Sequence, residues 1–413
     1  MTQAYSSSRD GGLKRLSLLI AIGWLGTNLG LAIGELPLKF LLKDDLHLTP
    51  ERVAGFFVIG QFVNYIKPVA GLLTDSFPLF GTRRRWYLLL SLLGTGIGWL
   101  FLAFVPRAFQ PMLITYTLMY TTVVFTSTTL GGVMVETGMR HGAEGRLTAQ
   151  RISMFRVGTL AGGPIAGWLT NYPFLWAAGA AAFLHICLVP LFFKTLPEKP
   201  TAKVNSEVWT DAGQTLKRLL KSKVLFAAAG MICLIAASPG FNTPLLFYQT
   251  NTLHLTKQFV GSLLLVSSAT GIGAAVFYYN YCKKWTLRRL LTLSILIHAI
   301  GTLTYFMYQS AWSAVLVTAI AGVSGTLAML PVYDLATRST PKGCEALGYS
   351  VMMSVWNLTN ALSDLVGSKL YSQYHFTFMN LIWVNAGTTA LVLIAVPFLP
   401  AALAERRDGA SVT

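Results

Sequence analysis

The sequence predicts an all-α membrane protein in which twelve transmembrane helices form two six-helix repeats. Apolar residues make up 54% of the 413 residues and charged residues only 12%, about half the charged fraction of a typical soluble domain. Many apolar runs reach the roughly 20 residues that a helix needs to cross a bilayer. Because these runs are continuously apolar and do not alternate, membrane-spanning β-strands are not expected.

Each expected span is an apolar run that lies between two polar joints. The first run is too long for the apolar core of a signal peptide, so we expect it to remain in the protein. The seventh contains Ser238-Pro239-Gly240 and Pro244, which interrupt the backbone hydrogen bonds and indicate a hinge. The twelve expected spans are residues 16–41, 51–74, 86–106, 111–136, 148–171, 173–194, 223–250, 257–282, 286–308, 311–335, 345–371 and 376–400.

The net charge of +16 does not indicate nucleic-acid binding, because the basic residues are distributed as in a membrane protein. If the first span runs outward from the cytosol, 23 of the 32 lysines and arginines flank the cytosolic side and four flank the other side. This asymmetry follows the positive-inside rule. We therefore expect a multi-pass protein of a bacterial inner membrane, with both termini in the cytosol.

The longest polar segment divides the chain into two bundles that resemble each other weakly. Residues 195–222 are expected to be a cytosolic linker between an N-terminal six-helix bundle at 1–194 and a C-terminal one at 223–413. Pro37 and Pro244 occupy matching positions of the two bundles, at an offset of 207 residues. Parallel repeats of this kind allow one half of a transporter to rock against the other around a central site.

A motif at the end of the second span indicates a cytosolic gate. It runs Lys67-Pro68-x-x-Gly71-x-x-Thr74-Asp75 and is followed by Arg83-Arg84-Arg85. Acid–base pairs at the ends of the second, fourth and tenth spans would form in one state of a transport cycle and open in the other. Alternatively, the arginines only fix the topology. The expected gate consists of Gly71, Asp75, Arg83, Arg84, Glu136, Arg140, Asp334 and Arg338.

Charged side chains inside the spans are candidates for substrate binding, because a charge in lipid is costly unless it faces protein, water or a ligand. Measured along straight helices, Lys67 and Arg156 lie at similar depths, while Glu35 and Asp364 lie nearer the outer side. An anionic substrate would partner the cations, and arginine can hold a carboxylate through two bonds. The candidate binding residues are Lys67, Arg156, Arg151, Glu35, Asp364, Asn64, Tyr65 and Trp356.

Structural roles remain open for these charges. Arg156 could bridge to Glu136 or to a backbone carbonyl of a neighbouring helix. Glu35 and Asp364 could belong to an outer gate, paired with the nearby Lys39 and Lys369. The same two carboxylates are also the candidates for carrying coupling protons.

The segment from Lys67 to Tyr87 resembles the folate–biopterin transporter family, a branch of the major facilitators. The family pattern is K-P-x-x-G-x-x-[ST]-D-x-x-P-x-x-G-x-R-R-x-x-Y, and its proline-containing spacing is longer than the G-x3-D-x2-G-R-R loop of ordinary major facilitators. The resemblance is strongest over residues 34–87. It implies a major-facilitator architecture and a secondary active transporter that moves folate or a related pterin by alternating access, with protons as the expected coupling ion. The residues that fit the pattern are Lys67, Pro68, Gly71, Thr74, Asp75, Pro78, Gly81, Arg83, Arg84 and Tyr87.

Two other functions remain open: a major-facilitator transporter of another small organic anion, and a membrane assembly factor that transports nothing. An enzyme is not expected, because the sequence has no P-loop, nucleotide-binding glycine motif, H-E-x-x-H or nucleophile elbow. Neither a cofactor nor a metal is expected, since the four cysteines have neither a disulfide nor a metal-ligand spacing. The expected partners are the anionic substrate, protons and the lipid bilayer, and we expect a monomer.

Overall fold

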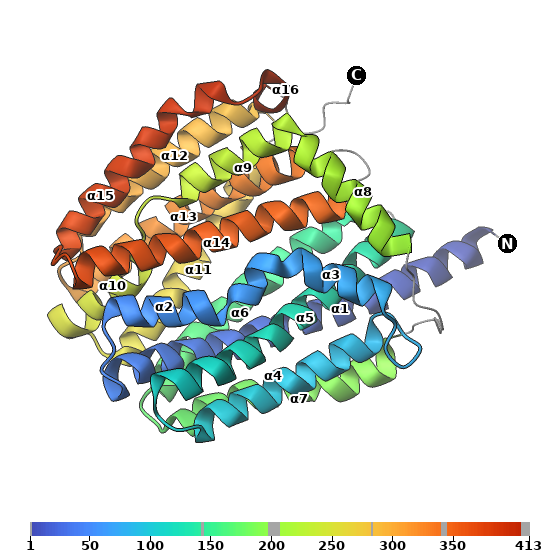
Figure 1. Ribbon diagram of the computed structural model, residues 1–413, viewed down its shortest axis with the longest axis horizontal. Coiled ribbons are helices and arrows are strands. Elements are labelled where there is room, and N and C mark those ends of the chain that lie inside the picture. Colours follow the sequence, from blue (N-terminus) through green and yellow to red (C-terminus); the bar gives the residue numbers. More distant parts are fainter. Residues whose placement is uncertain (1, 142–143, 197–206, 282–283, 340–344, 406–413) are drawn as a thin grey trace. The chain divides into compact units, whose positions relative to one another are not determined.

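The computed structural model confirms that the protein is all-α (Figure 1). Apart from an isolated antiparallel bridge between Leu79 and Thr82, the regular elements of the described residues are helices. The chain divides into two units, which are described separately below. The structure describes residues 2–141, 144–196, 207–281, 284–339 and 345–405, with the side chains of residues 1–12 and of several helix ends left out.

Unit 1 consists of residues 1–41 and 67–210. Its longest helix, α1, packs along both α6 and α7, while α4 lies between α5 and α7 (Figure 1). Small residues permit the close approach of these helices: a side chain at Gly162 would meet Ala32, and one at Gly34 would meet the ring of Trp99. The helices of unit 1 are α1 (Thr2–Phe40), α3 (Lys67–Ser76), α4 (Arg85–Phe104), α5 (Phe109–His141), α6 (Glu144–Leu169) and α7 (Phe174–Thr195).

Unit 2 consists of residues 42–66 and 211–413. Within it, α14 packs against α2 and α9, and α13 packs against α11 and α12. Helix α8 (Glu207–Lys221) leads from the first unit into the second. The other elements are η1 (Leu41–Asp45), α2 (Pro50–Gly60), η2 (Phe62–Ile66), α9 (Lys223–Ala236), α10 (Asn242–Phe247), η3 (Tyr248–Thr252), α11 (Lys257–Tyr281), α12 (Leu287–Leu303), η4 (Thr304–Met307), α13 (Ala311–Ser339), α14 (Glu345–Ser372), α15 (Phe378–Leu391), η5 (Val392–Ile394), η6 (Val396–Phe398) and α16 (Ala401–Ala404).

The second expected span is a broken helix. After α2 the chain bends by 45° and continues through the tight 3₁₀ turns of η2 into α3. Pro68 explains the break, because it has no N–H to donate to the carbonyl of Asn64 and its ring crowds that carbonyl. Lys67 is therefore the first residue of α3, and it is also where the chain enters unit 1 again.

The seventh expected span is broken between α9 and α10, at the predicted Ser238-Pro239-Gly240. Neighbouring helices satisfy the freed backbone groups. The N–H of Gly240 donates to the carbonyl of Ser363 at 2.9 Å, and the side-chain amide of Asn385 donates to the carbonyl of Pro239 at 2.9 Å. A Cβ atom at Gly367 would lie 1.6 Å from the carbonyl oxygen of Gly240, so only glycine allows α14 to approach this closely.

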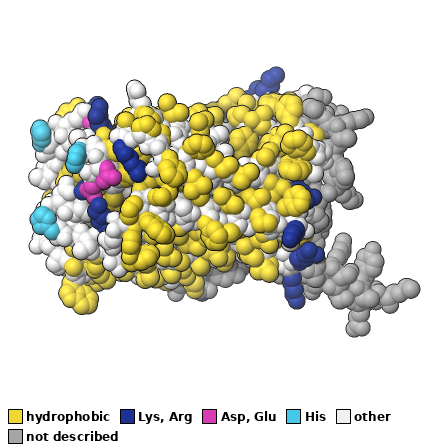
Figure 2. Space-filling view, turned by 90° about the horizontal axis from the view of Figure 1, so that it is seen from below, with side chains coloured by type: hydrophobic (Ala, Val, Ile, Leu, Met, Phe, Trp, Pro, Cys, Tyr) yellow, Lys and Arg dark blue, Asp and Glu magenta, His cyan; other side chains and the backbone are white. Residues whose placement is uncertain are grey.

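The protein is a multi-pass membrane protein. Eight of the described helices are long and apolar enough to cross a bilayer, or nine if the bent pair α2 and η2–α3 is counted as one span. Helix α9 is a shorter apolar helix, and α6 and α14, which carry Arg151, Arg156 and Asp364, are not among the eight. Figure 2 shows many exposed hydrophobic side chains on the face that it presents, as expected for a protein surrounded by lipid.

Candidate functional site

Lys67 and Arg151 both lie in unit 1, where their charges act on each other. Lys67 lies at the start of α3, and Arg151 lies in the first half of α6, which packs along α1. The two side chains are close enough for their positive charges to repel each other. The guanidinium carbon of Arg151 also lies 4.4 Å from the ring centroid of Trp24 on α1. Two cations and an aromatic ring therefore form a cluster, which we call the cation cluster.

The cation cluster lacks a counter-charge among the described residues. No described carboxylate forms an ion pair with Lys67 or Arg151, although both side chains are partly buried. The indole N–H of Trp24 is also buried, without an acceptor among the described residues. Like charges that are withdrawn from water repel strongly. An anion with several acceptor atoms would neutralise both cations, and it offers the acceptors that these donors need.

Arg156 lies further along α6 than Arg151 and is half-buried. It already interacts with other residues of the protein. The sequence left open that Arg156 forms a bridge to Glu136. In the structure, the carboxylate of Glu136 forms its ion pair with Arg84. The cation whose charge acts on Lys67 in the described structure is Arg151.

The two carboxylates expected near the outer side have different surroundings. Glu35 on α1 accepts a long hydrogen bond of 3.4 Å from the hydroxyl of the buried Tyr116, and it interacts electrostatically with Lys39, one turn along the helix. Asp364 on α14 accepts two hydrogen bonds from Thr243, one from the backbone N–H at 3.0 Å and one from the hydroxyl at 2.6 Å. Asp364 thus caps the N-terminus of α10, and its two oxygens are both occupied.

The remaining candidates for substrate binding lie in unit 2. Asn64 and Tyr65 belong to η2, which packs against α14. The hydroxyl of Tyr65 donates to the backbone carbonyl of Val58 at 3.1 Å. Trp356 of α14 is partly buried and lies edge-on to the ring of Tyr333, with the centroids 6.5 Å apart.

Part of the expected cytosolic gate is assembled around Arg84. Its guanidinium donates to Glu136 from Nη2 at 3.0 Å and from Nε at 3.2 Å, and to the hydroxyl of Thr74 at 3.2 Å. The guanidinium lies directly over Gly132, where an added Cβ would be 2.5 Å from its carbon. These contacts tie the residues before α4 to both α3 and α5. Gly71 of α3 faces Thr128 of α5.

The other gate residues are less fully described. Arg83 interacts within the protein, and Asp334 accepts a long hydrogen bond of 3.5 Å from the hydroxyl of Tyr278. The side chains of Asp75, Arg140 and Arg338 lie outside the described part of the structure.

Sequence reasoning missed an ion-pair cluster that lies within unit 2. Asp44 of η1 accepts from Lys43 at 2.8 Å and from Lys257 of α11 at 2.6 Å. The ammonium of Lys43 also lies 5.3 Å from the ring centroid of Phe247 at the end of α10. The cluster joins the segment before the second span to two helices from the second half of the sequence. Its only sequence signal is a pair of lysines on the side that has few basic residues.

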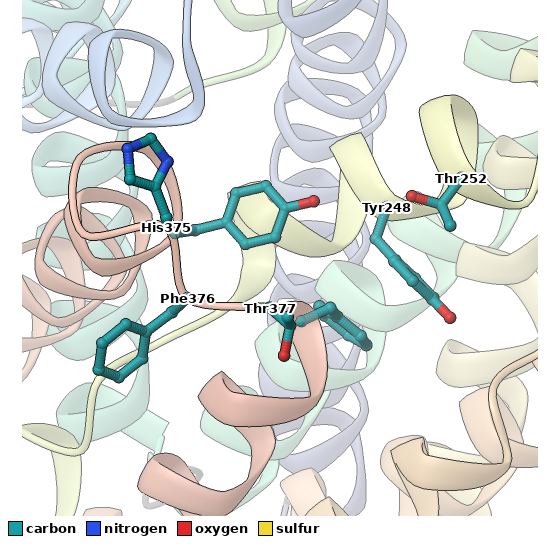
Figure 3. A pocket seen from close by; sticks show the side chains of 7 residues that line it. Tyr248, Thr252, His375, Phe376 and Thr377 are labelled. Carbon is teal, nitrogen blue, oxygen red and sulfur yellow. The ribbon is translucent and has the colours of Figure 1, made fainter.

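An open aromatic pocket of about 400 Å³ also lies within unit 2 (Figure 3). Tyr248 stacks on Phe378 in its wall, with the ring centroids 4.3 Å apart. The residues that line this pocket include no carboxylate, lysine or arginine, and none of them belongs to the cation cluster. The lining residues are Tyr248, Thr252, Tyr371, His375, Phe376, Thr377 and Phe378.

Comparisons with known proteins agree with the resemblance found in the sequence. The sequence model of the BT1 family matches residues 29–408. The chain is 29% identical to the folate-biopterin transporter of Synechocystis sp., over 89% of this chain and 78% of that protein. It is 22% identical to folate transporter 1 of Plasmodium falciparum, over 84% of this chain and 71% of that protein.

Solved structures of transporters share the fold. A single-residue mutant of the nucleoside transporter NupG superposes with a TM-score of 0.75 at 15% identity, covering 93% of this chain and 99% of that one. A D-xylose-proton symporter has a TM-score of 0.73 at 14% identity, covering 94% and 98%. At these identities the likeness establishes the fold alone.

Proposed function

Because this chain belongs to the BT1 family, we propose that it moves folate or a related pterin across the membrane by alternating access. The protein is a secondary transporter rather than an enzyme, as are its relatives and structural neighbours. The substrate class is suggested by the relatives that are named folate-biopterin and folate transporters. The cation cluster independently supports an anionic substrate, and folate is an anion.

The observation that carries the proposal is that Lys67 and Arg151 repel each other electrostatically while neither forms an ion pair with a carboxylate among the described residues. Folate has a flat pteridine at one end and a glutamate with two carboxylates at the other. A carboxylate placed between Lys67 and Arg151 would form charge-assisted hydrogen bonds with both. Trp24 supplies a flat wall beside the arginine. Glu35, Asn64, Tyr65, Trp356, Arg156 and Asp364 remain proposed contacts for other parts of the substrate or of the cavity.

We place the chain in a bacterial inner membrane as a monomer with twelve spans in two six-helix repeats and both termini in the cytosol. Support comes from helices at all twelve expected spans and from the excess of basic residues on one side. In this arrangement residues 1–194 and 223–413 are the two bundles, and residues 195–222 are the linker.

Two charge clusters serve as gates in this proposal. On the cytosolic side, the pair of Arg84 and Glu136 holds the loop before α4 in place, with Gly71, Asp75, Arg83, Arg140, Asp334 and Arg338 as further gate residues. On the outer side, Asp44 holds Lys257 against the segment that precedes α2. Alternating access requires such contacts to form and break between states.

Protons are the proposed coupling ion, and Glu35 is the preferred carrier. Asp364 is already engaged as the cap of α10, and its protonation would remove an acceptor that the helix needs. Among the described residues, Glu35 has the long bond from Tyr116 and the field of Lys39. Its carboxyl group can therefore gain and lose a proton without breaking a structural cap.

Uptake of radiolabelled folate into proteoliposomes that contain the purified protein tests the function. We expect saturable uptake that an inward proton gradient accelerates and that unlabelled folate inhibits. A second candidate, transport of another small organic anion, is favoured by the same cation cluster, since any carboxylate suits it. Absence of folate uptake together with saturable uptake of a different carboxylate would replace the first proposal with the second.

A further inference from the structure

Helix α8 presents an exposed apolar stripe next to exposed lysines. Leu216 and Leu220 are 46% and 60% exposed, and their spacing of four residues puts them on one face of the helix. Lys217 and Lys221 are also exposed and follow the stripe along one side of it. No acidic residue occurs between residues 214 and 226.

A different face of α8 is fixed to the protein. Leu219 is only 2% exposed and packs in a core cluster with Leu225 of α9 and Leu287 of α12. This contact fixes the rotation of the helix about its own axis and leaves Leu216 and Leu220 exposed beside the core. The stripe is therefore a constrained surface rather than a loosely placed segment.

The position of α8 along the chain brings the stripe to the membrane surface. The helix ends at Lys221, and after one residue the apolar helix α9 begins at Lys223. Ser222 caps α9, because its hydroxyl accepts the N–H of Leu225 at 3.2 Å. Since α9 enters the bilayer, the last turns of α8 lie at the level of the lipid headgroups.

We propose that α8 is an interfacial helix that binds anionic phospholipid. Leu216 and Leu220 would enter the boundary of the acyl chains, while Lys217 and Lys221 extend to the phosphate groups. Lipid is the occupant that fits best, because the stripe is continuous with an apolar helix and the charged residues in the last two turns of α8 are all basic. This interaction adds a dependence on lipid composition that the proposed transport activity does not itself require.

Hydrogen exchange of the full-length protein in nanodiscs tests the proposal. The backbone amides of α8 should exchange at least about fivefold more slowly in discs containing phosphatidylglycerol than in pure phosphatidylcholine, since each lysine near an anionic surface contributes about fivefold to binding. The K217Q/K221Q variant should lose this difference. The K14Q/R15Q variant is the matched control, because it removes two exposed cations from α1 and should retain it.

Native mass spectrometry provides a second readout, as the K217Q/K221Q variant should retain fewer bound phosphatidylglycerol molecules than the control. Equal exchange of α8 in both lipids, measured on the unmodified protein, would overturn the proposal whether or not a variant folds. Protection that rises with protein concentration would indicate a protein partner and would overturn it as well. Neither result bears on folate uptake, which is measured separately.

Discussion

Asp364 of α14 caps the N-terminus of α10 through Thr243, accepting both its backbone N–H and its hydroxyl. The broken seventh span is thereby attached to α14 next to the hydrogen bond that the N–H of Gly240 donates to the carbonyl of Ser363. The predicted hinge is consequently a segment with satisfied backbone groups, in which α10 is fixed to its neighbour. This arrangement has consequences for stability and for proton coupling.

Replacing Asp364 with alanine should lower the stability of the protein by about 1–2 kcal/mol, the usual cost of losing a helix cap. The D364N variant retains an acceptor oxygen and should lose less than the alanine variant. Thermal unfolding in detergent measures both. If D364A is as stable as the unmodified protein, the cap contributes nothing and Asp364 is available for another role.

The E35Q variant should separate proton coupling from substrate movement. Glutamine keeps the shape of Glu35 but cannot release a proton, so accumulation driven by a proton gradient should disappear. Exchange of labelled for unlabelled substrate across the same membranes should continue, because it requires no net proton movement. The D364N variant is the control and should still accumulate substrate; the opposite pattern would assign the proton to Asp364.

A methyl group at position 132 should disturb the cytosolic gate. In the G132A variant the new Cβ would lie 2.5 Å from the guanidinium carbon of Arg84, so the arginine must move away from Glu136. We expect uptake to fall by about fivefold, corresponding to roughly 1 kcal/mol of lost gate interaction. The G131A variant has open space around its Cβ and should transport normally. Equal rates in the two variants would argue against a gating role for this pair.

Gly367 is expected to be the least replaceable glycine of α14. The G367A variant places a Cβ on the carbonyl oxygen of Gly240, which the backbone can relieve only by separating α14 from the broken span. We expect a loss of about 3 kcal/mol or more, at the upper end of overpacking costs. The matched control is G387A in α15, where nothing lies within 4 Å. Similar thermal unfolding of the two variants would show that the two helices separate easily.

Much of the fold follows from the pattern of apolar runs, because span length and helix breakers are local properties. The described residues are helical at the expected spans, and eight or nine of these helices are long and apolar enough to cross a bilayer; the break at Ser238-Pro239-Gly240 was predictable from its residues. The break before Lys67 was not predicted, although Pro68 signals it. Depths calculated for a straight second span place Arg156 at the level of Lys67, while the charge that acts on Lys67 in the structure is that of Arg151; the roles of both arginines stay predictions.

Tertiary contacts account for the other differences. The sequence indicates that Asp364 is a buried charge but not that the N-terminus of α10 lies beside it. Likewise, Asp44 and Lys257 lie far apart in the sequence, and nothing in their local sequence shows that they form an ion pair of 2.6 Å. Arg84 and Glu136 were both predicted as gate residues, and the structure pairs them; whether they gate transport remains a prediction for the variants above.

The most direct test of the cation cluster is equilibrium binding of folate and of a pterin without glutamate to the purified protein. The K67Q and R151Q variants should each bind folate at least about tenfold more weakly, the effect of losing one charge-assisted hydrogen bond, and should bind the glutamate-free pterin as before. The K369Q variant, which alters an exposed lysine of α14, should bind both normally. Unchanged folate affinity in both K67Q and R151Q would contradict the account.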